Sequence, residues 1–461
     1  MNTIIQQFQE KIILDIKKEI ENIFLEGISD ISHLIITIDD NLKELGRELV
    51  KYVLEESDKM IKALPERKKS WVVHGNEKKT LITEFGAVEY ERTYYKSKAN
   101  KGFTYLVDEH FGIEKYQRID KGLTAKMVDL SCEYSYEKSA ELAVKPVKLS
   151  RQTVKNKIRE IGEIDNRKPD RSGERKPVMK LYVEADEDHV ALQDGTNTMV
   201  KLVYVHEGKE IRKGRNQLNN PHYFSGLYKN TEELWLEVID YIDEHYDLDN
   251  IETIYLAGDG ASWIREGLNW LPCSRYVLDR YHLNKYVLRA TGHIPGKRPE
   301  LWDALNRCDY GGVKEVFKEI IKATETESKK EAVKESYRYI LRNRDGIEIY
   351  SKDPYVLGCS AEGHVSYVLS DRMSGRPMGW SKEGADQMAR LRAFKHNGGS
   401  RQDLYRILNG KKKVEKLEIK RENYIELIKK NSLYPEAKEV MPILRRGKVD
   451  AAFAAIKSLA F

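Results

Sequence analysis

The sequence predicts an α/β fold, in which a mixed five-stranded sheet with helices on its faces follows a mostly helical N-terminal region. Three observations support this. Apolar residues recur at helical spacing over residues 1–65. From residue 178 onward, short runs alternate between apolar and polar residues, as half-buried strands do. Between them lies a polar stretch with two prolines (163–177), which is typical of a linker.

The composition excludes several classes of protein. Hydrophobic residues make up 40% of the chain, so a sizeable core is possible, and the net charge of +5 with 33% charged residues indicates interspersed signs. Mild basicity permits nucleic-acid binding through local patches without requiring it. No apolar run approaches the length of a membrane span, and the N-terminus lacks the shape of a signal peptide. We therefore expect a soluble, cytoplasmic protein.

Cysteine usage agrees with a reducing compartment. The four cysteines include no Cys-x-x-Cys pair, which argues against a zinc ribbon or a disulfide framework. Their positions are Cys132, Cys273, Cys308 and Cys359.

The N-terminal part divides into three predicted regions. Residues 1–70 should form amphipathic helices that pack on the rest of the chain or on a second subunit. Residues 71–118 should form a small domain containing a β-hairpin that turns near Gly86. The charges and tyrosines of this hairpin could rest on DNA or form the wet face of a small sheet, and the sequence does not separate these alternatives.

Residues 119–165 suit a helix-turn-helix. A helix at 136–143 is followed by a connector with Pro146 and a second helix that begins after Ser150, a good N-cap. An ordinary helical hairpin with a basic outer face is an equally good interpretation. In a helix-turn-helix, the second helix would offer four polar side chains to a major groove. These are Arg151, Gln152, Lys155 and Asn156.

The part at 178–395 carries the predicted sheet. Three strands (178–193, 199–206 and about 220–227) precede helix 231–245, strand 251–258, helix 261–269, strand 275–279 and helix 282–290. This order is that of an RNase H-like domain. Residues 296–350 are charged and strandless, and we interpret them as a helical insertion. Helices at 360–373 and 383–394 follow, and then a helical tail (396–461) whose lysine run at 411–413 we expect to be solvated.

Three acidic residues lie where such a sheet could bring them together. Asp186 lies in an alternating apolar run, Asp259 ends another, and Glu362 opens a helical stretch. A carboxylate at the tip of a buried strand is costly unless it is paired or bound to metal. Residues two apart on a strand share a face, so Glu184 and Asp188 point the same way as Asp186, and one or two of the three could hold metal. Three carboxylates with waters and a phosphate suffice for Mg²⁺, and two such ions could activate a nucleophile and stabilise a leaving oxygen.

Each acid taken singly has a plainer interpretation. An Asp at a strand end is often a turn residue or helix cap, and a helical Glu usually lies on the surface. The hypothesis depends on the three occurring together at the expected points of one fold. Asp279 and His282 share a helix face, where they could orient water, contact the scissile phosphate or brace Asp259, or could form a helix cap with a half-buried histidine.

Together these residues resemble those of a known family. The chain is similar to bacterial insertion-sequence transposases of the DDE type, most closely the ISLre-type family, which is related to the Mutator-like transposases. The resemblance is carried by five blocks, specific in their order and spacing and covering nearly the whole chain. They are Leu-Tyr-Val-Glu-Ala-Asp (181–186) with Val-Ala-Leu-Gln (190–193), Leu-Ala-Gly-Asp-Gly-Ala (256–261), Asp-Arg-Tyr-His (279–282), Gly-Cys-Ser-Ala-Glu-Gly (358–363) and Gly-Trp-Ser-Lys-Glu-Gly-Ala (379–385).

The resemblance implies Asp186, Asp259 and Glu362 as catalytic metal ligands for Mg²⁺ or Mn²⁺, with Asp279 and His282 assisting. Glu362 lacks the Asn-rich context of better-known relatives, so Glu383 is a rival for the third acid. We prefer Glu362 because the insertion precedes it and the Gly-Trp-Ser segment follows it.

The implied substrate is double-stranded DNA. Such enzymes bind the terminal inverted repeats of their element, cut the strands and join the 3′ ends to a target, and they act as homo-oligomers on paired ends, at the nucleoid. Phosphate contacts should come from lysine and arginine and depend on salt. The candidates are Arg151, Lys155, Lys157, Arg280, Lys285, Arg372 and Arg376.

Two other functions compete with this one. A metal-dependent nuclease of the same fold would cut DNA without rejoining it, and strand-transfer products would separate the two. A DNA-binding regulator descended from a transposase would have a spent active site, which the intact acidic set argues against.

Overall fold

The structure is a computed structural model that describes residues 31–99, 102–167, 175–212 and 214–410, with a few residues between 13 and 21. The predicted helical tail beyond 410 and most of the helical prediction for residues 1–30 lie outside the described residues. The chain divides into two compact units. The first comprises Met1–Leu130, Ser135–Val154 and Tyr405–Phe461, and the second comprises Ser131–Tyr134 and Lys155–Leu404. The polar stretch predicted as a linker therefore lies inside the second unit.

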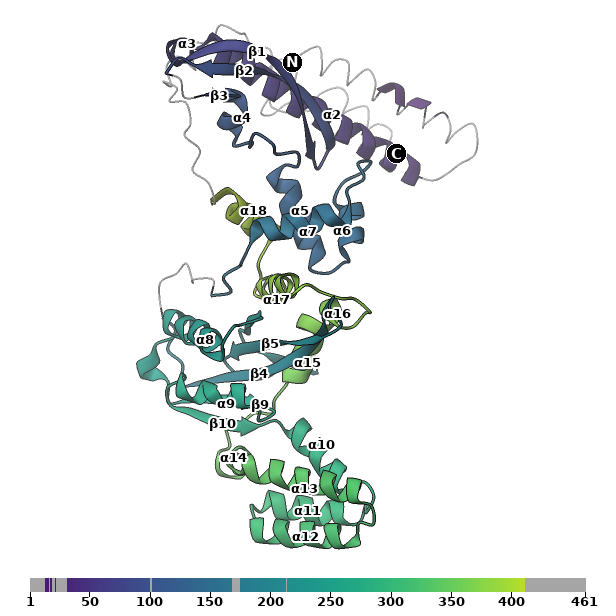
Figure 1. Cartoon of the computed structure of the whole chain (residues 1–461), viewed down its shortest axis with the longest axis vertical. Helices are drawn as coiled ribbons and strands as arrows, with labels where there is room; N and C mark the ends of the chain where they lie inside the picture. Colours follow the sequence, from purple (N-terminus) through teal and green to yellow (C-terminus); the bar gives the residue numbers. More distant parts are fainter. Residues whose placement is uncertain are drawn as a thin grey trace, which may run out of the picture. The chain divides into compact units, whose positions relative to one another are not determined.

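The first unit contains a long helix packed on a three-stranded sheet (Figure 1). The hairpin predicted near Gly86 is present: Thr83 pairs with Gly86, whose φ of 116° is one that side-chain-bearing residues rarely adopt. The elements are α2 (Ile31–Ala63), α3 (Pro65–Ser70), β1 (Trp71–Thr83), β2 (Gly86–Ser97), β3 (Phe103–Thr104) and α4 (Leu106–Phe111).

A buried ionic cluster holds α4 to this sheet. The Asp108 carboxylate, 2% exposed, accepts a hydrogen bond from the Tyr90 hydroxyl at 2.7 Å and is paired with Lys79 at 3.1 Å and with Arg92. Burial lowers the pKa of Lys79, and the Asp108 charge opposes this shift. Breaking one partner of such a buried pair costs several kcal/mol, typically about 3–5. This cluster therefore stabilises the packing of α4 against β1 and β2.

Three shorter helices follow: α5 (Lys121–Ser131), α6 (Tyr136–Ala143) and α7 (Arg151–Ile161). Ser135 caps α6 by accepting a hydrogen bond from the Lys138 amide at 3.2 Å, and Ser150 accepts one from the Thr153 amide at 3.1 Å, as its N-cap prediction requires. Both helices of the predicted helix-turn-helix therefore exist, while their docking into a DNA groove stays a prediction.

The second unit is built on a mixed five-stranded sheet with the order β10-β9-β4-β5-β8 (Figure 1). Strands β4, β9 and β10 are parallel, and β5 runs antiparallel between β4 and β8. The predicted α/β class with a five-stranded mixed sheet is confirmed. The strands are β4 (Lys180–Ala191), β5 (Asn197–His206), β8 (His222–Gly226), β9 (Thr253–Gly258) and β10 (Ser274–Leu278).

Alternation on β4 separates the two faces of the sheet. Leu181, Val183 and Ala185 are fully buried in the main core, against the Trp235 ring of α8 (Thr231–His245). The same core continues through several helices after β9 and includes the stretch predicted as an insertion. These are α9 (Ser262–Arg265), α10 (Arg280–Thr291), α11 (Lys297–Asn306), α12 (Tyr310–Ala323) and α13 (Glu327–Arg342).

The opposite face of the sheet is rich in aromatic and polar side chains. Tyr182 and Tyr255 stack at 5.2 Å between ring centroids, and Tyr204 lies beside Tyr223 at 5.4 Å. Elements from the end of the second unit pack against the sheet: α15 contacts β4, α14 contacts β10 and α17 contacts β8. The elements of this part are α14 (Arg344–Lys352), α15 (Ala361–Val365), a π-helical turn η3 (Ser366–Ser370), α16 (Asp371–Met373) and α17 (Lys382–His396), with α18 (Arg401–Gly410) next in the chain.

The structure also contains a two-stranded hairpin that the sequence did not predict, β6 (Lys209–Arg212) with β7 (Arg215–Leu218). It lies between β5 and β8 in the chain. None of the described helices is both long and apolar enough to cross a membrane.

Candidate active site

Asp186 lies near the middle of β4, on the face opposite the main core. Two acids share this face with it and have partners within the fold: Glu184 is buried in a hydrogen-bond network, and Asp188 accepts a hydrogen bond from the Ser374 hydroxyl at 2.7 Å. The Asp186 carboxylate accepts a hydrogen bond from the Glu187 amide at 2.9 Å. Of the three acids that the sequence placed on one face, Asp186 is the one turned toward the other candidates.

Asp259 directly follows β9, the parallel neighbour of β4. Glu184 pairs with Ala257, and two further residues along each strand bring Asp186 level with Asp259. The Asp259 carboxylate accepts the Ala261 amide at 2.8 Å, and the Tyr339 hydroxyl donates to the Asp259 carbonyl at 2.5 Å. The loop after β9 thus fixes the side chain of Asp259, and a tyrosine of α13 fixes its backbone.

Two glycines make the position of Asp259 possible. A Cβ on Gly258 would lie 2.9 Å from the Ala185 carbonyl oxygen, so a side chain there would push β9 away from β4. Gly260 has a φ of 93°, and a Cβ on it would lie 2.5 Å from the Asn343 side chain. The Gly-Asp-Gly sequence is therefore a geometric requirement of this strand end.

The pKa of Asp186 depends on the other two predicted acids. The pKa of Asp186 is raised to about 6, chiefly by burial and also by the nearby charges of Asp259 and Glu362, while the Glu187 amide and His282 oppose the increase. Carboxylates influence one another in this way when they are close and poorly screened. Asp259 and Glu362 therefore both lie close enough to Asp186 for their charges to act on it, although the three are far apart in the sequence.

Glu362 reaches this position because its helix is anchored to β4. The Glu184 carboxylate accepts hydrogen bonds from the Ser360 hydroxyl at 3.0 Å and from the Ser360 amide, at the start of α15. Glu362 itself is exposed, so its side chain can change rotamer without disturbing the core. The rival Glu383 lies in the first turn of α17 and forms an ion pair with Arg159 at 2.9 Å, away from the groups that act on Asp186.

The anchoring role of Glu184 is the main feature that the sequence analysis missed. Its carboxylate, 2% exposed, also accepts the Tyr204 hydroxyl at 2.6 Å and lies 3.0 Å from His206 Nε2 and 3.2 Å from Lys209 Nζ. Burial alone would raise the pKa of Glu184, but the His206 hydrogen bond and the Lys209 charge outweigh it and hold the pKa well below its usual value. Glu184 is therefore a charged structural group.

Asp279 and His282 form the predicted pair at the start of α10. Asp279 caps the helix by accepting the Tyr281 amide at 3.0 Å, and its other oxygen lies 2.8 Å from His282 Nδ1. The hydrogen bond with Asp279 raises the pKa of His282, burial opposes it, and the charges of Asp259 and Asp186 add to the increase. The helix-cap interpretation is confirmed, while the active-site role of the pair stays a prediction.

The donor set suits a hard divalent cation. Mg²⁺ and Mn²⁺ prefer carboxylate oxygens, and a cation beside Asp186 would offset both its burial and its repulsion by Asp259 and Glu362. Among the described residues, no three His, Cys, Asp or Glu side chains already stand in the arrangement of metal ligands. The acids fit such an ion by chemistry and proximity, and rotation of the exposed Glu362 side chain would have to complete the site.

The predicted DNA contacts divide into exposed and buried residues. Arg372 is 6% exposed: its guanidinium donates to the Ser131 carbonyl at 2.8 Å and lies 5.0 Å from the centre of the Trp380 ring. The expectation that Arg372 contacts phosphate is corrected, because its charge is used inside the fold. Lys155 and Lys157 on α7 are partly exposed. The other candidates are exposed: Arg151, Gln152 and Asn156 on α7, Arg280 and Lys285 on α10, and Arg376 after α16.

Comparison with known proteins identifies one family. The model of an uncharacterised protein family, UPF0236, matches residues 25–407. A UPF0236 protein of Caldanaerobacter subterraneus subsp. tengcongensis is 49% identical over 403 residues, which cover 87% of this chain and 85% of the relative. The name of this relative joins eleven locus labels. Another from the same organism, whose name joins four, is 48% identical over 403 residues, covering 87% of this chain and 85% of that relative.

A more distant relative comes from Streptococcus gallolyticus. It is a UPF0236 protein named for its place in the vanSb 3′ region, and it is 26% identical over 402 residues, covering 84% of this chain and 85% of the relative. The similarity therefore spans both units of the structure.

Proposed function

The chain belongs to the UPF0236 family. From the geometry of the site, we propose that it is a DNA transposase. In this proposal it binds the terminal inverted repeats of its own insertion sequence as a homo-oligomer. It then cleaves the strands at those ends and joins them to target DNA, with Mg²⁺ or Mn²⁺.

The strand order supports an RNase H-like assignment for the second unit. Numbered along the chain, the five sheet strands lie in the order 5-4-1-2-3, with the second antiparallel to its neighbours. This is the order of RNase H-like domains, in which catalytic acids sit on the first strand and at the end of the fourth. Asp186 and Asp259 occupy these two places.

One observation carries the proposal: Asp186, half-buried on the central strand, is within electrostatic reach of both Asp259 and Glu362, and its pKa is raised to about 6. A fold seldom keeps three acids together at a cost in stability without a use for them, and strongly perturbed groups cluster at functional sites. The three acids come from a strand, a strand end and a helix that follows a long insertion, as the resemblance to DDE transposases implies.

Each residue has a task that follows from its placement. Asp186, Asp259 and Glu362 would hold the divalent ions, which when bound supply charge neutralisation and activation of the attacking oxygen. Glu184 fixes α15 to β4, so that Glu362 faces Asp186. Asp279 orients His282 and raises its pKa, which favours the protonated imidazole. His282 would then donate a hydrogen bond to the scissile phosphate.

The names of the relatives add support of a different kind. We interpret a name that joins many locus labels as one sequence present at many loci, which is what repeated transposition leaves behind. Names joining eleven and four labels in Caldanaerobacter fit that pattern. A transposase encoded by the mobile element itself would be copied with it.

The experiment uses the purified full chain with a labelled duplex that carries the mapped end of its element. We expect nicks at the element boundary that require Mg²⁺ or Mn²⁺, and joined products when target DNA is added. Asp259→Asn should abolish both reactions and leave end binding intact. The matched control is Asp303→Asn, an acid on α11 whose side chain is 64% exposed, which should cleave like the parent protein.

Three results would contradict the proposal. Cleavage by Asp259→Asn at the parental rate would remove the acids from the mechanism. Metal-dependent cleavage without joined products would favour the nuclease alternative. End binding without any cleavage in either metal would favour the regulator.

A further inference from the structure

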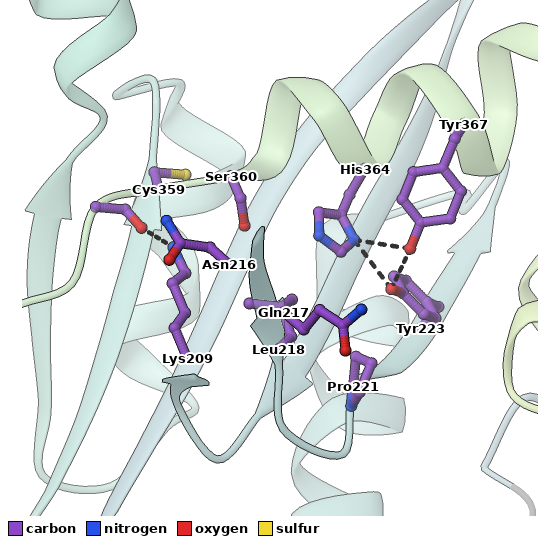
Figure 2. Close-up of a pocket in the computed structure, with 11 residues that line it drawn as sticks. Lys209, Asn216, Gln217, Leu218, Pro221, Tyr223, Cys359, Ser360, His364 and Tyr367 are labelled. Atoms are coloured by element: carbon purple, nitrogen blue, oxygen red, sulfur yellow. Dashed lines mark hydrogen bonds between the residues drawn. The ribbon is translucent and has the colours of Figure 1, made fainter. Parts of the chain in front are cut away.

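A cavity lies on the same sheet face as Asp186. It has a volume of about 490 Å³ and is bounded by the β6–β7 hairpin, by β8, and by the segment that leads into α15 and η3. Figure 2 shows His364 and Tyr367 projecting from one helical stretch toward Tyr223 on the sheet. None of the tasks assigned to the acids uses this cavity.

One wall of the cavity is aromatic and internally hydrogen-bonded. The Tyr223 hydroxyl lies 2.9 Å from His364 Nδ1 and 2.5 Å from the Tyr367 hydroxyl, which in turn lies 3.1 Å from His364 Nδ1. The Tyr204 and His364 rings stack at 4.4 Å between centroids. These contacts fix the ring planes, while Tyr367 keeps 37% of its surface exposed. A rigid aromatic wall suits a planar ligand that stacks.

The other wall carries amide groups. Asn216 and Gln217 on β7 are exposed and line the cavity opposite the rings. An amide side chain offers both a donor and an acceptor, the pattern with which proteins read the edge of a nucleobase.

Among the described side chains that line the cavity, the one cation is already compensated. This cation, Lys209, lies 3.2 Å from the buried Glu184 carboxylate and donates to the Gly358 carbonyl. A phosphate would need a positive charge that is not already compensated. These described lining residues therefore favour a planar, hydrogen-bonding ligand.

Register places the cavity beside the acids. Glu184 pairs with Tyr204, and Tyr204 pairs with Tyr223, so all three side chains lie on one row of one face. Asp186 lies two residues further along β4. From the spacing of strands and residues in a sheet, the Cα atoms of Asp186 and Tyr223 are roughly 12 Å apart. One or two nucleotides of an extended strand can bridge that distance.

We propose that this cavity binds a nucleobase of a DNA strand that has left the duplex stack beside the cleaved phosphate. The base stacks on the exposed ring of Tyr367, which is tilted by 58° from the ring of His364, and its edge meets Gln217 and Asn216. The proposal rests on the proposed DNA-cleaving function, because it assigns the base to the strand held at the acids. Unstacking a base costs a few kcal/mol, which stacking and edge contacts in such a pocket offset.

The test measures base binding separately from cleavage. The probe is a short single-stranded deoxyoligonucleotide with one 2-aminopurine, whose fluorescence falls when it stacks on an aromatic ring, titrated with the full chain in EDTA. We expect saturable quenching, and about tenfold weaker binding for Tyr367→Ala. Tyr367→Phe keeps the ring and should bind nearly as the parent does. Gln217→Ala, an exposed change that leaves the fold intact, should weaken binding several-fold.

The controls exclude binding through the backbone or through any surface tyrosine. Tyr355 is 56% exposed elsewhere in the same unit, so Tyr355→Ala should bind like the parent protein. The same oligonucleotide with an abasic site in place of the 2-aminopurine should compete about tenfold less well. Absence of quenching, equal loss in Tyr367→Ala and Tyr355→Ala, or equal competition by the abasic strand would overturn the proposal.

The outcome is separable from that of the transposase assay. End cleavage without quenching would overturn the nucleobase pocket alone. Quenching that depends on Tyr367 without any cleavage would keep the pocket as a DNA-binding site and overturn the transposase.

Discussion

The Glu184 carboxylate on β4 accepts hydrogen bonds from both the backbone amide and the hydroxyl of Ser360, the residue that precedes α15. These residues are 176 positions apart in the sequence. The contact attaches the helix that carries Glu362 to the strand that carries Asp186. The geometry of the acid cluster therefore depends on a buried glutamate that does not belong to the cluster itself.

Removing the charge of Glu184 should loosen this attachment. Glu184→Gln keeps the shape but loses a buried charge that faces His206 and Lys209, so we expect the free energy of unfolding to fall by about 3 kcal/mol. A small displacement of Glu362 should lower end cleavage by about a hundredfold. Urea unfolding and cleavage rates would measure the two effects.

The control for Glu184 is Glu252→Gln, whose side chain is 59% exposed and 3.7 Å from Lys180. A surface pair of this kind should change stability by less than about 1 kcal/mol. Parental stability and cleavage in Glu184→Gln would show that Ser360 is held by other contacts.

Asp186 should cost the metal-free protein stability at neutral pH. Its folded pKa of about 6 exceeds the unfolded value, so the native state binds the proton more tightly. The cost is absent below about pH 4, grows as the pH rises toward 6 and is constant above it. In EDTA at pH 8, Asp186→Asn should therefore be more stable than the parent by roughly 3 kcal/mol, and near pH 3, below both pKa values, the gain should vanish.

Denaturant midpoints at both pH values would test this, with Asp303→Asn as the exposed-acid control. Added Mn²⁺ should raise the midpoint of the parent protein and leave Asp186→Asn nearly unchanged, because ligand binding to the native state stabilises it. An equal Mn²⁺ effect on both proteins would place the ion elsewhere.

The two candidate third acids should behave differently. Glu362→Gln should lower end cleavage more than a hundredfold, since even indirect partners of a metal site cost about 10- to 100-fold when they are changed. Glu383→Gln should cleave nearly as the parent does, because Glu383 forms a surface pair with Arg159. If only Glu383→Gln loses activity, the assignment of Glu362 is wrong.

Arg372 and Arg376 should separate folding from DNA binding. Arg372→Ala removes a buried guanidinium with its hydrogen bond to Ser131 and its packing on Trp380, and we expect a loss of about 2–4 kcal/mol in thermal or urea unfolding. Arg376→Ala should leave stability within about 0.5 kcal/mol. If Arg376 contacts phosphate, the slope of log affinity against log salt should fall by about one. A large loss of stability in Arg376→Ala with little loss in Arg372→Ala would contradict the observed burial of Arg372.

Local patterns predicted the elements that carry the acids. The apolar alternation along residues 180–186 predicted which face of β4 is buried, and Gly86 predicted the turn of the hairpin. The β6–β7 hairpin was missed because its strands are short and largely polar, without the apolar alternation that marks a half-buried strand. These successes and failures both concern residues close in sequence.

Roles that depend on distant partners could not be predicted. Glu184 looked like a further metal ligand because it shares a face with Asp186, and only its pairing with Ser360 and His206 shows it as an anchor. Arg372 looked like a surface cation, and its partner Ser131 is 241 residues away. A sequence pattern gives the face of a strand or helix, whereas the tertiary fold decides what that face meets.

The most direct test of the converging acids is a crystal structure of the full chain soaked in Mn²⁺, with the ion located by its anomalous scattering. The account predicts one or two peaks, each bound by carboxylate oxygens of Asp186 and Asp259, with Glu362 turned toward them. Mn²⁺ bound elsewhere while these three carboxylates remain without it would contradict the account.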